Sequence, residues 1–223
     1  MVIVVVGSPT GRQTEQGVMA SGVAATVARI AAAAGAEVQL VGKVGEGPAG
    51  DAILHSLAQS HVGHVAVLRD ASPAAVIAQS AHEPQALLDE EGELPHDADG
   101  AEPPAIKEPA APTLDSGDLQ LALRYLPDYR VVVLADPLDD PALGTVVAAA
   151  GWAGAQLIVV VAAASKATAI PDGATVLEAP AVDPDGAFAA VVGAYAAALD
   201  RGARPAEAFA TASAGSGWSA VVD

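Results

Sequence analysis

Two groups of residues early in the chain have types and spacing that could do chemistry. The loop from Gly7 to Gly11 follows a run of valines and could cradle a phosphate. It lacks a Lys-Thr or Lys-Ser end and the Gly-x-Gly-x-x-Gly spacing, so a tight turn is the favoured interpretation. His61 and His64 have the spacing of metal ligands, yet no cysteine or carboxylate cluster flanks them, so surface histidines are the favoured interpretation.

Acidic side chains form two further groups. Asp136, Asp139 and Asp140 follow a predicted strand at its carboxyl end, where ligands bind in open α/β sheets. They could hold a cation, although Asp-Pro turns explain them equally well. The run from Asp89 to Glu102 is expected to be solvated surface, with weak binding of divalent cations as the alternative.

Strands and helices alternate along the chain and would position these residues. Val2–Val6 is a continuous β-branched run that ends at Gly7, which is typical of a buried parallel strand. Further strands are expected at 37–41, 64–68, 130–135, 156–162 and 174–177, and helices at 21–34, 50–60, 119–126, 141–150, 187–200 and 205–214. Residues 75–79 and 85–89 could form a short hairpin. The alternation predicts a doubly wound parallel sheet.

Composition limits the partners of the chain. A net charge of −17 opposes binding to nucleic acid and to anionic membranes. The absence of cysteine excludes disulfides and thiolate chemistry. The sequence shows no basic leader and no apolar stretch long enough to cross a bilayer, so we expect a cytoplasmic protein with a single domain over residues 1–223.

The middle of the chain differs from its surroundings. Between Ala81 and Asp118 there are eleven acidic residues and one basic residue, and the proline-rich run from Glu102 to Pro112 falls in the same segment. This composition predicts a solvated excursion, either a loop, a linker or the remnant of a lid, at about residues 72–112.

One segment near the N-terminus resembles a signature of the ribokinase-like (PfkB-type) carbohydrate kinases. Ser21 and Gly22 stand where that family has paired glycines, and Thr26 stands where it has an asparagine. Gly45 and Gly50 follow where the family has a Val-Gly step and a further glycine. The resemblance implies that Ser21, Gly22, Thr26 and Gly45 bind the substrate.

A second segment resembles the family's Asp-Thr-x-Gly-Ala-Gly-Asp-x-Phe, which opens a long Ala-rich helix. Here Asp183 is followed by Pro, Asp185, Gly186, Ala187 and Phe188, and then by such a helix. The resemblance implies nucleotide binding at Gly186 and Ala187, and a catalytic role for Asp183 or Asp185. It implies no metal ligand, and it implies a ribokinase-like three-layer α/β/α fold with a mostly parallel central sheet and a reduced lid.

This second segment departs from the family in length. It is about three residues shorter than the family's, which is nearly one helical turn, so the Gly-Ala-Gly-Asp anion hole and base are missing. Asp185 is then expected to cap the following helix, with a substitute catalytic base as the alternative. Its carboxylate would also occupy the anion site and repel a phosphate.

These departures favour a non-catalytic homologue of sugar kinases, with a regulatory role or with a sugar or nucleoside as its ligand. No cofactor is certain on this interpretation. The first alternative is an active ATP-dependent phosphotransferase that uses ATP and Mg²⁺. The second is a structural, homo-oligomeric interaction protein, with a homodimer formed through the acidic excursion because lids of the family often pair.

Overall fold

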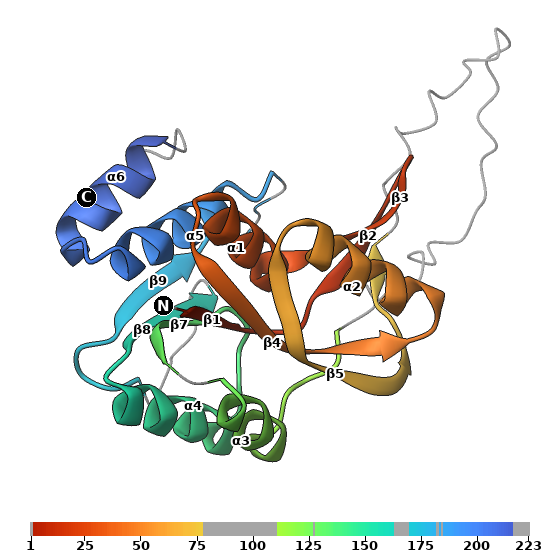
Figure 1. Ribbon diagram of the computed structural model, residues 1–223, viewed down its shortest axis with the longest axis horizontal. Helices are drawn as coiled ribbons and strands as arrows, with labels where there is room; N and C mark the ends of the chain where they lie inside the picture. Colours follow the sequence, from red (N-terminus) through yellow and green to blue (C-terminus); the bar gives the residue numbers. More distant parts are fainter. Residues whose placement is uncertain are drawn as a thin grey trace, which may run out of the picture.

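The computed structural model of the chain describes residues 2–77, 111–126, 128–162, 170–181, 183 and 185–215. Its centre is a six-stranded parallel sheet in the order β5-β4-β1-β7-β8-β9 (Figure 1). The apolar strands in the middle of the sheet are buried on both faces, as parallel sheets require. The strands are β1 (Val2–Val6), β4 (Glu37–Glu46), β5 (Val62–Pro73), β7 (Tyr129–Leu134), β8 (Gln156–Ala162) and β9 (Thr175–Ala179).

Helices cover both faces of this sheet and make the protein a three-layer α/β/α structure (Figure 1). Ile3 and Val5 of β1 face one helical layer, and Val4 and Val6 face the other, because successive strand residues point to opposite sides. One layer contains α1 (Gly22–Ala33), α2 (Pro48–Gln59), α5 (Ala187–Asp200) and α6 (Pro205–Gly215). The other layer contains α3 (Ser116–Arg124) and α4 (Asp140–Ala153).

Small residues allow α1 and α5 to pack closely. A Cβ atom added to Gly193 of α5 would lie 2.7 Å from the carbonyl oxygen of Val27 and 2.9 Å from Cβ of Ile30, both on α1. The Ala-rich faces of these helices are therefore a packing requirement of the fold, since larger side chains would separate the helices.

A second, smaller sheet lies beside the main one and has the order β3-β2-β6. It consists of β2 (Thr10–Thr14), β3 (Gly17–Ser21) and β6 (Val76–Ile77), with β2 and β3 forming an antiparallel hairpin. The N–H of Ala20 donates to Oγ of Ser56 at 3.0 Å, which ties this sheet to α2.

The sequence predicted the α/β fold class correctly, and the expected three-layer arrangement with a mostly parallel central sheet is confirmed. The tight turn expected from Gly7 to Gly11 is wrong in its second half, because Thr10 and Gly11 already belong to β2. The expected hairpin strand at 75–79 includes β6, whereas residues 85–89, the acidic run 89–102 and most of the excursion at 72–112 lie outside the described residues. Within the described part of the chain, no helix is long and apolar enough to cross a membrane.

Candidate functional site at the carboxyl edge of the sheet

The main sheet has a topological switch point between β1 and β7, where the direction in which the chain adds strands reverses. From β1 the chain proceeds to β4 and β5 on one side, and from β7 it proceeds to β8 and β9 on the other. Open α/β sheets bind ligands in the crevice at such a switch point, outside the carboxyl ends of the strands. The residues that directly follow β1 and β7 are therefore the first candidates for a site.

Ser8 and Asp136 meet at this switch point. The N–H of Ser8 donates to Oδ2 of Asp136 at 2.7 Å. Burial raises the pKa of the Asp136 carboxyl, and the hydrogen bond from the Ser8 N–H opposes that shift in part. A Cβ on Gly7 would lie 2.8 Å from Cβ of Ala24 and 3.0 Å from the Asp136 carboxylate, so glycine is needed where this carboxylate approaches β1.

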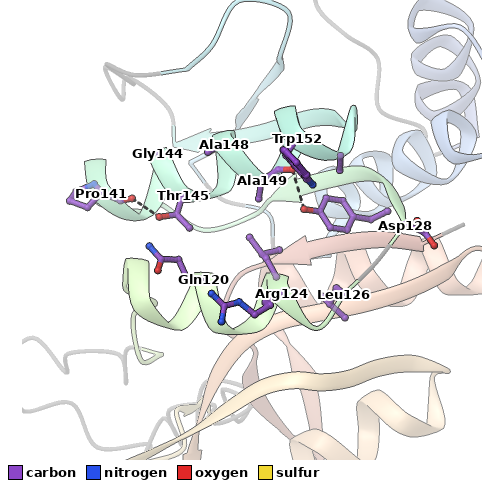
Figure 2. Close-up of a pocket in the computed structure, with 13 residues that line it drawn as sticks. Gln120, Arg124, Leu126, Asp128, Pro141, Gly144, Thr145, Ala148, Ala149 and Trp152 are labelled. Carbon is purple, nitrogen blue, oxygen red and sulfur yellow. Dashed lines mark hydrogen bonds between the residues drawn. The ribbon is translucent and has the colours of Figure 1, made fainter.

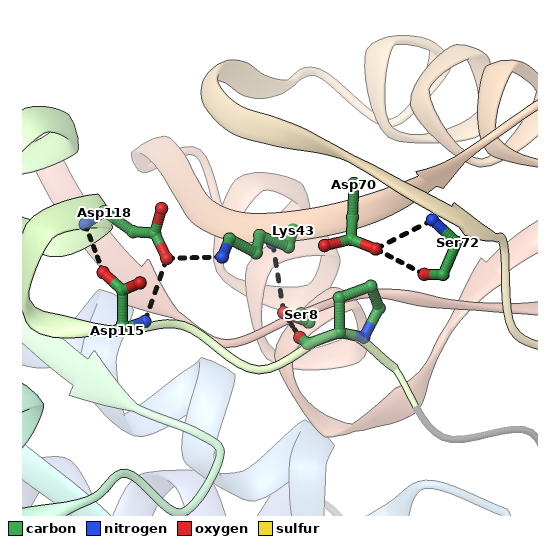
Figure 3. A network of polar contacts seen from close by, with 7 residues as sticks. Ser8, Lys43, Asp70, Ser72, Asp115 and Asp118 are labelled. Atoms are coloured by element: carbon green, nitrogen blue, oxygen red, sulfur yellow. Dashed lines mark hydrogen bonds and ion pairs between the residues drawn. The ribbon is translucent and has the colours of Figure 1, made fainter.

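A chain of polar contacts runs from Ser8 to α3 (Figure 3). Oγ of Ser8 donates to the carbonyl oxygen of Pro112 at 2.6 Å and accepts from the N–H of Lys43 at 3.0 Å. Nζ of Lys43 lies 2.5 Å from Oδ2 of Asp118, and both side chains are mostly buried. The hydrogen bond to Asp118 is the largest of the effects that raise the pKa of Lys43, and burial opposes it.

The acidic residues around Lys43 are held by nearby donors. Asp115 and Asp118 form a reciprocal capping box at the start of α3, each side chain accepting from the backbone N–H of the other at 2.9 Å. Asp70 accepts from the hydroxyl and the N–H of Ser72, and these bonds lower the pKa of its carboxyl (Figure 3). This network fixes the end of β4 and the start of α3 to each other.

The structure does not bring all of the residues predicted to bind substrate together. A Cβ on Gly22, at the start of α1, would lie 3.2 Å from Oγ1 of Thr10, so these two residues are neighbours. This Thr10 oxygen is buried and has no hydrogen-bond partner. Ser21 precedes α1 and pairs with Thr10 in the small sheet. Gly45 lies elsewhere, since a Cβ there would lie 2.3–2.4 Å from backbone atoms of residues 72–74, and this close packing explains the glycine without a ligand.

The structure brings Thr26 of α1 next to Gly186, the residue at the start of α5 that was predicted to bind nucleotide. A Cβ on Gly186 would lie 3.4 Å from Cγ2 of Thr26, and Gly186 is in the left-handed conformation with φ of 68°. The beginnings of α1 and α5, which are far apart in the sequence, thus lie side by side (Figure 1).

Asp183 occupies the start of α5. Its Oδ1 accepts from the N–H of Phe188 and its Oδ2 accepts from the N–H of Ala189, each at 3.2 Å. Its carbonyl oxygen accepts from the N–H of Gly186 at 3.2 Å. The sequence predicted that Asp185 caps this helix, and that prediction is wrong. The carboxylate that accepts from the N–H groups at the start of α5 belongs to Asp183. A helix start uses these same groups to bind an anion.

The candidate metal ligands do not assemble. Asp139 caps α4 by accepting from the N–H of Ala142 at 2.9 Å, as expected for an Asp-Pro turn. His61 is exposed with φ of 58°, and Nδ1 of His64 lies 3.3 Å from the carbonyl oxygen of Val62. Among the described residues, no group of three or more histidine or acidic side chains could hold a metal ion.

Comparison with known proteins agrees with the fold and with the first predicted signature. Residues 2–99 match the pfkB family carbohydrate kinases. No curated protein matches the sequence. The pfkB match covers less than half of the chain, and the chain as a whole has the ribokinase-like fold.

Three solved structures illustrate this likeness. An E. coli protein described as a ribokinase II in complex with ATP and Mg²⁺ is 13% identical, with a TM-score of 0.63, and the match covers 96% of this chain and 91% of that one. Aminoimidazole riboside kinase from Salmonella enterica is 17% identical, with a TM-score of 0.62, and the match covers 100% of this chain and 94% of that one. Ribokinase from Arabidopsis thaliana complexed with ribose and ATP is 18% identical, with a TM-score of 0.59, and the match covers 96% of this chain and 90% of that one. Identities this low establish the fold and not the activity.

The nucleotide that the family uses does not fit the residues at the start of α5. A phosphate group there would need the N–H groups of Phe188 and Ala189, which donate to Asp183 instead. The carboxylate would also repel the phosphate, since both are anions.

Sequence reasoning missed two residues of the site and gave a third a different role. Lys43 and Asp118 were not singled out, because they are 75 positions apart and neither belongs to a motif. Asp136 was considered only as a cation ligand or a turn residue, and its hydrogen bond to Ser8 needs the strand order to be foreseen. The one available signal was its place after a strand, at the carboxyl end.

Proposed function

We propose that this protein is a non-catalytic relative of the PfkB sugar kinases that binds a small, hydroxyl-bearing ligand, a sugar or a nucleoside, at the carboxyl edge of its sheet. The observation that carries the proposal is the Asp183 carboxylate at the start of α5. This carboxylate accepts the hydrogen bonds that the start of α5 would have to give to a nucleotide phosphate. The protein would then respond to its ligand by a change in shape or assembly and not by turnover.

The physical cost of restoring a nucleotide site supports this proposal. A capping aspartate stabilises a helix by about 0.5–2 kcal/mol, and a phosphate would have to displace it. The net charge of −17 opposes a polyanion further. Phosphoryl transfer depends on positioning and on electrostatic stabilisation of the transferred group, and both would be weakened here.

Two polar side chains, those of Thr10 and Asp136, support a hydroxyl-bearing ligand. Oγ1 of Thr10 is buried beside Gly22 without a partner, and unpaired buried oxygens are costly unless something donates to them. The Asp136 carboxyl lies at the switch point with a raised pKa, as ligand-binding carboxyls often do. A sugar or nucleoside hydroxyl could donate to either oxygen.

Isothermal titration of the purified protein tests the proposal. Mg-ATP is titrated alone and in the presence of pentoses, hexoses and nucleosides, and each of these compounds is also titrated alone. The proposal expects saturable heat with at least one sugar or nucleoside and none with Mg-ATP. Saturable heat with Mg-ATP, followed by ligand-dependent release of ADP, would instead establish the active phosphotransferase that uses Asp183 or Asp185.

A further inference from the structure

The chain has few aromatic residues, and two of them are exposed on one side of the molecule. It contains two tryptophans, three tyrosines and two phenylalanines. Phe188 and Tyr195 are buried in the core, whereas Trp152 near the end of α4 is 93% exposed and Tyr125 after α3 is 70% exposed. Leu121 of α3 is 50% exposed as well. Exposed aromatic and apolar side chains that gather in this way mark interaction surfaces.

Trp152 lines a groove between α3 and α4. The groove has a volume of about 1140 Å³, and Figure 2 shows Gln120 and Arg124 of α3 on one side and Thr145, Ala148 and Trp152 of α4 on the other. A second hollow of about 800 Å³ adjoins this groove, and Tyr125 and Val65 of β5 are among its lining residues. The side chain of Val65 is 78% exposed. The two hollows share lining residues, namely Leu126, Asp128, Tyr129 and Ala153. We call this surface the α3–α4 face.

The charge of the α3–α4 face favours a second copy of the chain as its occupant. The charged side chains that line the two hollows are Arg124, Arg130, Glu37 and Asp128, two basic and two acidic. The charges that line the α3–α4 face thus balance on a chain of net charge −17, so two copies that meet there do not bring two negatively charged linings together. In a two-fold contact the same patch faces itself, and both signs of charge allow reciprocal pairs at its rim.

We propose that two copies of the chain pair through their α3–α4 faces, with Trp152 of each copy seated against the groove of the other. Tryptophan is among the residue types that most often dominate the binding energy of interfaces, and Trp152 stands almost fully exposed at this groove. The pairing rests on the surface of α3 and α4 and is independent of the ligand-binding proposal above. It also differs from pairing through the small sheet, which lies beside α2.

Sedimentation equilibrium of the full chain, over a wide range of protein concentration, tests the pairing. We expect a monomer–dimer equilibrium in which Trp152→Asp raises the dissociation constant at least about tenfold. Met19→Asp is the matched control, because it adds the same charge at an exposed apolar residue of the small sheet. It should change the dissociation constant less than about threefold, since mutations outside an interface have small effects.

Three results would overturn the proposal: a monomer at every concentration, an unchanged dimer in Trp152→Asp, or a dimer that Met19→Asp weakens as much as Trp152→Asp does. The side chain of Trp152 is almost fully exposed, so the variant is expected to fold, and thermal unfolding followed by circular dichroism verifies this. A second measurement uses Trp218→Phe, which leaves Trp152 as the one tryptophan. Its emission should shift to the blue as the protein is concentrated, and a constant emission would contradict the buried position of Trp152 in the pair.

Discussion

The N–H of Ser8 donates to the carboxylate of Asp136 at 2.7 Å, across the topological switch point of the main sheet. This bond joins the ends of β1 and β7, the two strands from which the chain spreads to opposite sides. The carboxyl is partly buried, and its burial raises the pKa. A charged Asp136 carboxylate therefore lowers the stability of the folded protein, and residues that bind ligands often have such a cost.

We therefore expect Asp136→Asn to stabilise the protein at pH 7, by about 0.5–2 kcal/mol, as substitutions that relieve a costly functional residue often do. Because the pKa of Asp136 in the folded protein is above its ordinary value of 3.8, the folded state holds this proton more tightly than the unfolded state. The contribution of Asp136 is thus most favourable below pH 3.8 and is lost as the pH rises through the folded pKa. Urea unfolding of both proteins as a function of pH measures this difference.

Asp139→Asn is the control for this prediction. Asp139 is also acidic but caps α4, and asparagine caps helices about as well as aspartate. The free energy of unfolding of Asp139→Asn should therefore differ little from that of the unmodified protein. A destabilised Asp136→Asn would show that the hydrogen bond from Ser8 outweighs the cost of the buried charge.

The ion pair between Lys43 and Asp118 should contribute to stability. We expect Lys43→Met to lower the free energy of unfolding by about 1–3 kcal/mol, since it removes a charged hydrogen bond between two mostly buried side chains. The pKa of Lys43 is raised above 10.5, so this contribution is complete below pH 10.5 and is lost as the pH rises through the folded pKa. Urea unfolding between neutral and alkaline pH measures both effects.

A double-mutant cycle with Asp118→Asn separates the pair from its surroundings. If the two side chains interact as the structure indicates, the double variant loses less stability than the sum of the two single losses. Additive losses would mean that Asp118 acts only through its capping box with Asp115.

Gly193→Ala tests the close approach of α1 and α5. The new Cβ would lie 2.7 Å from the carbonyl oxygen of Val27, so α5 must move away and we expect a loss of about 1–3 kcal/mol. Gly144→Ala in α4 is the matched control, because nothing lies within 4 Å of a Cβ there and alanine favours a helix by up to about 1 kcal/mol. Thermal unfolding should shift in opposite directions for the two variants, and equal shifts would contradict the packing.

The sequence predicted the elements whose patterns are strong. Helix α5 has the bounds that were expected, residues 187 to 200, because an Ala-rich run lies between Gly186 and Gly202. The hairpin of β2 and β3 was missed, since its strands are short and partly polar and its turn at Glu15 and Gln16 lacks the Asn-Gly or Asp-Gly signal.

Contacts between distant residues were not predictable to the same degree. The pairing of Lys43 with Asp118 depends on where α3 packs relative to the end of β4, and no local pattern encodes that placement. The choice of Asp183 over Asp185 as the helix cap depends on the left-handed turn at Gly186, which directs the earlier carboxylate toward α5. Local sequence favoured the nearer aspartate, because a cap usually directly precedes its helix.

Removing the Asp183 carboxylate should both weaken α5 and open its anion site. We expect Asp183→Ala to lower the free energy of unfolding by about 0.5–2 kcal/mol, because the two hydrogen bonds from the N–H groups of Phe188 and Ala189 to this carboxylate are lost. Inorganic phosphate or pyrophosphate should then raise the melting temperature of the variant more than that of the unmodified protein, since ligands that bind only the folded state stabilise it. Asp185→Ala removes the same charge two residues away and should show neither effect. A phosphate response of equal size in all three proteins would mean that Asp183 does not block the anion site, and the main support for a non-catalytic function would be lost.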